Sequence, residues 1–250
     1  MPDRDPDAPA ATDGDAPTYL FVLCPPYSGS TLLWNLVSTS EAVSALPTEG
    51  QFLPEVAELM RHEPWNRDRE LPWPRIKAVW DAHWDHRKSV LVEKSPPNII
   101  RTADIVAHFQ PVAFLVMVRD PYAHCEGLMR RNGWSPELAA EFAVRCLEQQ
   151  DRNARELAPA LRITYEQLAG DPDATARRIE AFLPRLGRLD TGRRFRIHAV
   201  DGYVERGIED LNATKIARLS TAERDAITTV LRRVPEAMRV WGYDYLEADR

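Results

Sequence analysis

The stretch CPPYSGSTLL at positions 24–33 most constrains what this chain can fold into. It follows an apolar run, Tyr19–Cys24, and leads into a helical pattern whose apolar face is formed by Leu32, Leu33, Leu36 and Val37. A strand that ends in such a loop and continues into a helix N-terminus favours anions, because loop amides and the helix dipole both attract negative charge. Three hydroxyls can donate to the same oxygens: Ser28, Ser30 and Thr31. The stretch therefore predicts a phosphate-type ligand.

This loop is close to a Walker A phosphate loop but departs from it at two positions. Cys24 stands where the first glycine of GxxxxGK[ST] belongs, and Ser30 stands where the lysine belongs. Because that lysine contacts the terminal phosphates of a nucleoside triphosphate, ordinary Mg-NTP hydrolysis is disfavoured. A different phosphate ligand is favoured, and a P-loop kinase for a small molecule stays as an alternative.

Composition limits the class of protein. With 250 residues, of which 44% are hydrophobic and 28% charged, the chain is typical of a soluble α/β protein with a substantial core. Residues 1–17 carry five Asp and one Arg, and so account for −4 of the formal charge of −6. We expect them to form a disordered leader, and residues 18–250 to form a single domain.

The same composition bears on partners and location. The chain lacks a basic platform for nucleic acid, a signal peptide and an apolar run long enough to span a bilayer, so we expect neither a nucleic-acid nor a membrane partner. Cys24, Cys125 and Cys146 are odd in number and have no metal-ligand spacing, which fits a reducing cytoplasm.

Apolar runs that predict strands alternate with helical patterns. The expected strands are 19–24, 89–93, 112–118 and 161–164, with a short one at 43–46, and the expected helices are 30–38, 52–62, 74–87, 99–109, 121–131, 136–157, 171–183 and 221–234. This alternation predicts an α/β, P-loop-like three-layer fold with a central parallel sheet and helices on both faces. The aperiodic stretch 186–207 is predicted to be a long loop, which in compact domains is often a functional lid.

Parallel sheets bind ligands outside the carboxyl ends of their strands. Besides the first loop, three residues follow or end predicted strands and should reach the same edge: Lys94, Arg119 and Tyr165. Asp120 and Pro121 suit the N-cap and first position of the helix after Arg119.

Four segments resemble the PAPS-dependent sulfotransferases, the enzymes that use 3′-phosphoadenosine-5′-phosphosulfate, and they occur in the family's order. They are CPPYSGSTLL, Lys94-Ser95-Pro96, VMVRDP at 116–121 and ITYEQL at 163–168. The resemblance implies a P-loop-like fold, PAPS as co-substrate without a metal, and a hydroxyl group on a small molecule, glycan or peptide as acceptor. The acceptor's identity and the oligomeric state stay open.

The resemblance also implies donor-binding residues. The 5′-phosphosulfate would lie on the loop, at Tyr27, Ser28, Gly29, Ser30, Thr31 and Leu32. Arg119 would hold the 3′-phosphate, with a structural ion pair as its alternative role. Tyr165 would contact the nucleotide or simply pack at a strand end. Arg206-Gly207 matches two residues of the family's C-terminal nucleotide loop.

Two residues are the candidates for catalysis. Glu49 lies where the tyrosylprotein and heparan branches place a Glu base, although Thr48-Glu49-Gly50-Gln51 also suits a helix capping box. Lys94 would stabilise the departing phosphate, or else it is an exposed lysine paired with Glu93. The cytosolic branch places its His base at the position of Pro96, and His83 is the reserve base here.

Two departures from the family pattern keep a non-catalytic nucleotide-binding protein as an alternative. Tyr27 stands where many members have Lys or Arg, and Gly127 stands where a Ser normally contacts the 3′-phosphate. Two other patterns favour structural roles. His83 and His86 belong to a charged helix that suits a solvated face better than a metal site, and Trp73, Trp80 and Trp84 have the spacing of a packed helix face.

Overall fold

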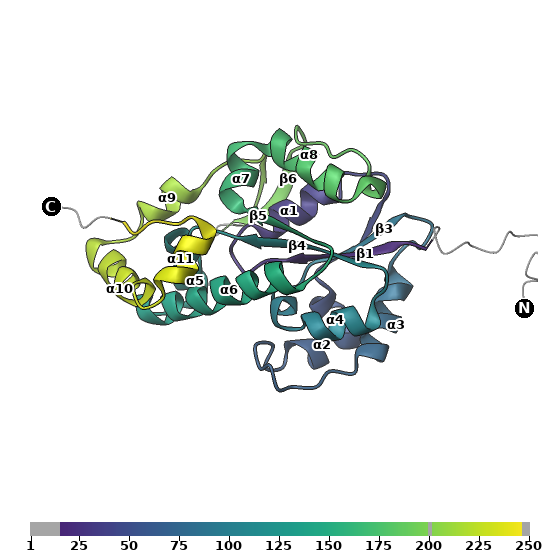
Figure 1. The fold of residues 1–250 in the computed structure, drawn as a ribbon, viewed down its shortest axis with the longest axis horizontal. Coiled ribbons are helices and arrows are strands. Elements are labelled where there is room, and N and C mark those ends of the chain that lie inside the picture. Colours follow the sequence, from purple (N-terminus) through teal and green to yellow (C-terminus); the bar gives the residue numbers. More distant parts are fainter. Residues whose placement is uncertain (1–15, 200–201, 247–250) are drawn as a thin grey trace, which may run out of the picture.

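A five-stranded parallel sheet forms the centre of the molecule in the computed structural model, which describes residues 16–199 and 202–246 (Figure 1). Its strand order is β2-β3-β1-β4-β5. The strands are β1 (Thr18–Leu23), β2 (Val43–Ala45), β3 (Val90–Glu93), β4 (Val112–Val118) and β5 (Ala160–Thr164). Parallel pairing requires crossovers, and the helices between successive strands supply them.

The helices cover both faces of this sheet (Figure 1). They are α1 (Ser30–Val37), α2 (Pro54–Arg61), α3 (Trp73–His83), α4 (Thr102–His108), α5 (Pro121–Asn132), α6 (Pro136–Glu156), α7 (Tyr165–Gly170), α8 (Pro172–Phe182), α9 (Asn212–Ile216), α10 (Thr221–Leu231) and α11 (Pro235–Trp241). Short 3₁₀ turns occupy Gly50–Phe52, Pro96–Ile100 and Pro184–Leu186. The predicted three-layer α/β fold is therefore confirmed.

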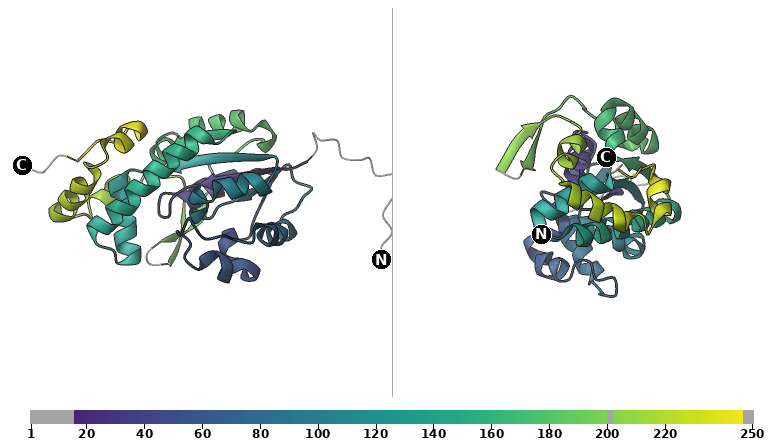
Figure 2. Two further views of the ribbon diagram at one scale, coloured as in Figure 1. Left: turned by 60° about the horizontal axis from the view of Figure 1, so that its bottom comes forward. Right: turned by 90° about the vertical axis from the view of Figure 1, so that its left-hand side faces the viewer.

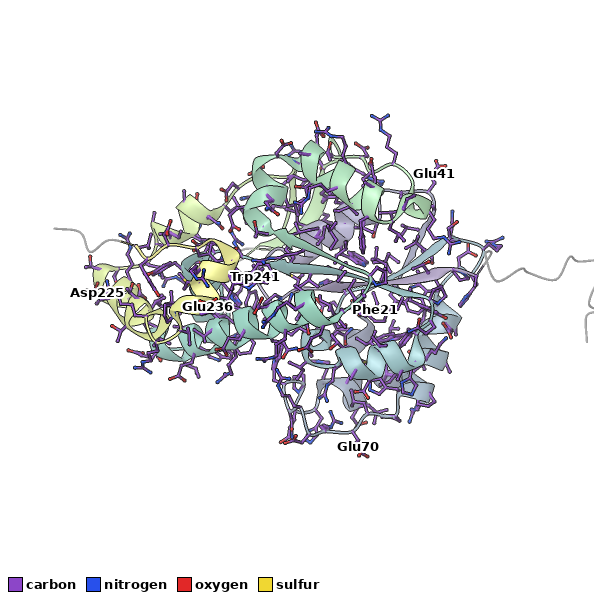
Figure 3. All side chains as sticks on the ribbon, viewed as in Figure 1. Phe21, Glu41, Glu70, Asp225, Glu236 and Trp241 are labelled. Atoms are coloured by element: carbon purple, nitrogen blue, oxygen red, sulfur yellow. The ribbon has the colours of Figure 1, made fainter. Side chains whose placement is uncertain are left out.

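Strand β1 shows why two layers of helices are needed. Tyr19, Phe21 and Leu23 belong to one apolar core with α3, α5 and α6, whereas Leu20 and Val22 belong to a second core with α1, α7 and α8. Because successive side chains of a strand point to opposite faces, an apolar run without polar interruptions needs cover on both sides. In Figure 3, Phe21 lies at the centre of the molecule, while the exposed Glu41, Glu70, Asp225 and Glu236 lie at its periphery.

The helix starts that were predicted from the capping residues Asp120, Asp171 and Ser220 are confirmed. The carboxylate of Asp120 accepts from the N–H groups of Tyr122 and Ala123 at 2.9 and 3.0 Å, and Asp171 accepts from Ala174 N–H at 2.9 Å. Ser220 and Glu223 form a reciprocal capping box at the start of α10.

One prediction of local structure is wrong, and one alternative that the sequence left open is excluded. The stretch 186–207 is not one long loop, because Phe195–Ala199 (β6) and Gly202–Arg206 (β7) pair as an antiparallel hairpin. The hairpin forms a sheet of its own beside α1 and stands away from the central sheet (Figure 2). No capping box forms at Thr48–Gln51 either, because Glu49 precedes a 3₁₀ turn and its side chain makes no cap hydrogen bond.

The tryptophans of α3 pack in the core, as their spacing predicts. Trp73, Trp80 and Trp84 are buried, and Trp80 packs against Phe21 and Phe109 with ring centroids 6.2 and 5.6 Å apart. The indole N–H of Trp80 also donates to the carbonyl of Gly50 at 3.2 Å. Trp80 thus joins the core to the turn that follows Glu49.

We expect Trp80→Ala to lower the free energy of unfolding by about 3–5 kcal/mol, because it removes a fully buried ring and leaves a cavity. Urea denaturation measures this, with Val106→Ala, at an exposed position, as the control. A loss no larger than that of the control would contradict the role given to Trp80.

Candidate active site

The loop between β1 and α1 adopts an uncommon backbone conformation. Tyr27 and Gly29 have φ angles of 60° and 89°, in the left-handed region that side chains other than glycine rarely enter. Gly29 precedes α1. The first backbone hydrogen bond of this helix joins the N–H of Leu33 to the carbonyl of Gly29 at 3.1 Å. No side chain caps this helix end. The amides of its first turn are therefore available to an anion.

Glycine is required at position 29 for a second reason. A Cβ atom built there would lie 2.6 Å from Cδ2 of Tyr165, which is closer than real atoms approach. The buried Tyr165 ring thus packs directly against the bare backbone of the loop.

An ion pair between Lys94 and Glu49 lies at the same helix end. The Lys94 ammonium bonds to Glu49 Oε1 and lies 3.3 Å from Thr31 Oγ1. The two side chains are 5% and 20% exposed, so both are largely withdrawn from water. Lys94 is therefore neither exposed nor paired with Glu93, the alternative that the sequence left open.

The neighbouring carboxylate, Glu93, fixes the turn that carries Glu49. Glu93 is fully buried and accepts from the N–H of Gly50 at 2.9 Å, from Ser95 Oγ at 2.5 Å and from Asn98 Nδ2. Ser95 Oγ also accepts from the N–H of Gln51 at 3.2 Å. The end of β3 therefore positions Glu49 through the backbone and binds its carboxylate through Lys94.

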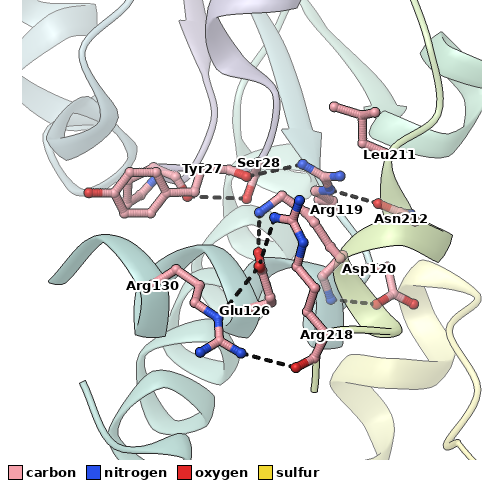
Figure 4. A network of polar contacts seen from close by, with 12 residues as sticks. Tyr27, Ser28, Arg119, Asp120, Glu126, Arg130, Leu211, Asn212 and Arg218 are labelled. Carbon is pink, nitrogen blue, oxygen red and sulfur yellow. Dashed lines mark hydrogen bonds and ion pairs between the residues drawn. The ribbon is translucent and has the colours of Figure 1, made fainter. Parts of the chain in front are cut away.

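Arg119, at the end of β4, is buried next to the loop (Figure 4). Its Nε donates to Asn212 Oδ1 at 2.7 Å, and its Nη1 donates to the carbonyl of Tyr27 at 3.3 Å. The guanidinium also stacks on the ring of Tyr165, 3.9 Å from its centroid. Nη2 is buried and has no partner among the described residues.

The environment of Arg119 favours an anion. Burial lowers the pKa of its guanidinium, and the nearby Glu166, Asp120 and Asp210 oppose that effect. A buried donor without a partner costs free energy. A phosphate oxygen at Nη2 would satisfy it.

A second polar cluster lies below the loop, around Glu126 of α5 (Figure 4). Glu126 is 1% exposed, and three cationic side chains converge on it: Lys215 at 2.5 Å, Arg218 at 3.4 Å and Arg130 at 3.9 Å. Asn212 and Lys215 both belong to α9. Sequence reasoning missed this cluster, because the only signal was a lysine and an arginine in a stretch without a recognisable motif.

Glu166 is a further residue that sequence reasoning missed. Its Oε1 accepts from Asn212 Nδ2 at 2.6 Å and from the Asp120 N–H at 2.9 Å, and its Oε2 accepts from the Tyr243 hydroxyl at 2.8 Å. It thus fixes the amide that bonds Arg119. The only signal in the sequence was its place in the segment ITYEQL.

Tyr165 adjoins the loop, and Arg206 and Gly207 are the other predicted site residues. The Tyr165 hydroxyl bonds to the backbone of Glu209 and Leu211, and its ring is covered by Arg119 and Gly29, which favours a role through Arg119. Arg206 lies at the end of β7, where its guanidinium is 3.9 Å from Glu209, and Gly207 follows it.

The two histidines lie at the end of α3 and beyond it, because the helix ends at His83 and His86 belongs to the turn that follows. His83 Nε2 is 3.4 Å from a Glu55 oxygen, and His86 Nε2 is 2.9 Å from the carbonyl of Asp81. In the part of the chain that the structure describes, no three His, Cys, Asp or Glu side chains gather as a metal site would require. None of the helices in residues 16–199 and 202–246 has an apolar stretch long enough to cross a lipid bilayer.

A family model described as "Sulfotransferase family" matches residues 17–185, which include the loop, Glu49, Lys94, Arg119 and Tyr165. The chain belongs to the sulfotransferase family. No curated protein gives a significant sequence match.

Solved structures share this sulfotransferase fold at low sequence identity. The sulfotransferase domain of the Synechococcus PCC 7002 olefin synthase superimposes with a TM-score of 0.59 at 18% identity, covering 93% of this chain and 98% of that domain. A sulfotransferase from Alicyclobacillus acidocaldarius gives 0.54 at 15% identity, with 90% and 96% covered. Mouse sulfotransferase SULT7A1 complexed with PAP gives 0.51 at 12% identity, with 91% and 89% covered.

Titration of Glu93 should appear in the stability of the protein. Burial raises the pKa of this carboxyl from 4.5 to about 7, against hydrogen bonds from Ser95 and the Gly50 N–H that lower it. The folded protein therefore holds this proton more tightly than the unfolded chain does. The resulting stabilisation is complete below the unfolded pKa and is lost as the pH rises through about 7.

We expect the free energy of unfolding of the wild type, relative to that of Glu93→Gln, to fall by on the order of 3 kcal/mol over this pH range. Urea denaturation at a series of pH values measures both proteins. The comparison cancels the titration of other groups, such as Asp120 and His124. A difference that is independent of pH would show that Glu93 does not titrate in this range.

Proposed function

We propose that this sulfotransferase moves a sulfuryl group from PAPS to a hydroxyl acceptor by in-line transfer. The observation that carries the proposal is the meeting of Glu49, Lys94 and Thr31 at the uncapped N-terminus of α1. A carboxylate that can take a proton and an ammonium that can stabilise an anion therefore adjoin the same anion site. The membership of the sulfotransferase family supports this reaction over phosphoryl transfer by a P-loop kinase.

Two anion sites on one edge suit the two phosphate ends of PAPS. The loop residues Tyr27, Ser28, Gly29, Ser30, Thr31 and Leu32 would bind the 5′-phosphosulfate through backbone amides and hydroxyls. Arg119 would bind the 3′-phosphate, and its unpartnered Nη2 is the donor that supports this. Arg206 and Gly207 would approach the nucleotide from the end of β7, and Tyr165 would hold Arg119 in place.

In the proposed reaction, Glu49 accepts the proton of the acceptor hydroxyl as its oxygen attacks sulfur. The bond between sulfur and the bridging phosphate oxygen breaks at the same time, and 3′,5′-phosphoadenosine leaves. Before this step, Lys94 turns from Glu49 to the bridging phosphate oxygen. This frees Glu49 to act as a base and places the ammonium where charge develops. The loop amides stabilise the same charge without rearranging.

Side chains near Glu49 bear on the kind of acceptor that the proposed site could bind. Tyr27, a residue of the loop, and Phe52, the last residue of the turn after Glu49, are 37% and 43% exposed, so aromatic surface is available near the proposed base. The cysteines bear on the cellular location. All three are free and buried, and we propose that the reaction takes place in the reducing cytoplasm.

We expect incubation with ³⁵S-labelled PAPS and pooled hydroxylated acceptors to give a sulfated product, which mass spectrometry identifies by its added sulfuryl group. Glu49→Gln should lower kcat by about 10²–10⁴-fold while leaving PAP binding nearly unchanged, because only proton transfer is removed. Full turnover by Glu49→Gln would show that another group, such as His83, is the base. PAP binding with no product from any acceptor would favour a non-catalytic nucleotide-binding protein.

We expect Arg119→Ala to weaken the binding of PAP by about 10–100-fold, because a charge-assisted contact is lost, and to weaken that of adenosine-5′-phosphosulfate far less. Isothermal titration calorimetry measures both affinities. Arg87→Ala, which changes an exposed arginine that pairs with Asp85 away from the loop, is the control. Equal losses for the two nucleotides would contradict contact with the 3′-phosphate.

A further inference from the structure

The position of Gly127 on α5 is filled from elsewhere in the chain. A Cβ atom at residue 127 would lie 2.8 Å from Cβ of Tyr27 and 3.2 Å from the ammonium nitrogen of Lys215. The helix therefore touches the loop at this residue, and the Lys215 ammonium occupies the space where a side chain at 127 would begin. Gly127 is thus required for this packing, and it brings a cation next to the loop.

Lys215 is held there by a single buried carboxylate. Its ammonium lies 2.5 Å from Glu126 Oε2 and is 19% exposed. Burial lowers the pKa of Lys215, the ion pair with Glu126 raises it, and the positive charges of Arg119 and Arg218 lower it further. Lys215 and Arg119 are therefore close enough to repel each other, and an anion between them would remove that repulsion.

Helix α9 brings two polar residues, Asn212 and Lys215, to this place. Asn212 bonds Arg119 Nε, and Lys215 follows three residues later on the same face of the helix. Arg119 Nη2 has no partner within the described part of the chain. A buried unsatisfied guanidinium nitrogen and a partly buried ammonium thus flank the same side of the loop.

We propose that Lys215 is a specificity-determining residue that binds the 3′-phosphate together with Arg119, and that Glu126 holds it in place until the nucleotide arrives. This inference rests on the proposed function and names residues outside the segment that the family model matches. On binding, the ammonium turns from Glu126 to a phosphate oxygen, while Arg218 stays beside Glu126 and keeps that carboxylate paired. Lys215 supplies the contact for which Gly127 has no hydroxyl.

The test measures binding rather than turnover. Isothermal titration calorimetry gives the affinities for PAP and for adenosine-5′-monophosphate, which lacks the 3′-phosphate. We expect Lys215→Ala to weaken the binding of PAP by about 10–100-fold and that of the monophosphate by less than about 3-fold. Lys215→Arg should restore most of the loss. Lys88→Ala, which removes a lysine that bonds the carbonyl of Glu41 far along the chain, is the control and should change neither affinity.

A second variant separates binding from a merely structural role. Glu126→Gln keeps the shape of the side chain and releases Lys215, so it should leave the affinity for PAP unchanged or raise it. If the Glu126 cluster only holds α9 in place, Glu126→Gln and Lys215→Ala will both weaken the two nucleotides equally, and the proposal is wrong. It is also wrong if Lys215→Ala binds PAP like the wild type. Wild-type protein that binds no PAP would instead overturn the proposed function itself.

Discussion

The packing of a bare backbone against an aromatic ring connects the two anion sites. Because Gly29 has no side chain, Tyr165 lies directly against the loop, and Arg119 stacks on the same ring. The ring therefore sets the distance between the amides at the start of α1 and the guanidinium at the end of β4. A larger residue at position 29 would displace the ring and the cation on it together.

The proposed base and its partner depend on a different strand of the same sheet. Glu93 ends β3 and reaches across to the N–H of Gly50, and Lys94, the next residue, binds Glu49. Successive side chains of a strand point to opposite sides, which explains why Glu93 and Lys94 have such different roles. Glu93 points into the interior, and Lys94 points toward the loop. Burial of Glu93 is offset by the three donors around it, which is how a fully buried carboxylate can hold a turn.

The strands, several helix starts and the edge of the sheet that carries the proposed site could be predicted from the sequence, because each depends on a local pattern of residues. Apolar runs gave the strands, Asp120 and Ser220 marked helix starts, and the loop with the residues after the strands indicated the edge on which the ligand should lie. The hairpin at 195–206 was missed although the sequence carries two signals for it. Phe195, Ile197 and Ala199 alternate with Arg196 and His198, and an Asp-Gly dipeptide of the kind that favours hairpin turns follows them. Pro54 also separates a 3₁₀ turn from α2 within the region predicted as one helix.

The contacts that could not be predicted are those between distant segments. Nothing near Lys94 in the sequence selects Glu49 over the adjacent Glu93 as its partner. Similarly, the loss of a hydroxyl at Gly127 is visible in the sequence, but the ammonium of Lys215 beside it comes from α9. Such pairings depend on how helices pack, and no local pattern encodes them.

A series of hydrogen bonds runs from Arg119 through Asn212 and Glu166 to Tyr243. It determines how much of the chain must be synthesised before this group of residues is complete. These bonds draw one wall of the proposed nucleotide site from residues that follow the last strand of the central sheet in the sequence. A growing polypeptide that has already completed its five strands still lacks Asn212 and Tyr243. All five strands of the sheet therefore precede part of the proposed nucleotide site in the sequence, and the proposed site needs Asn212 and Tyr243 as well as the sheet.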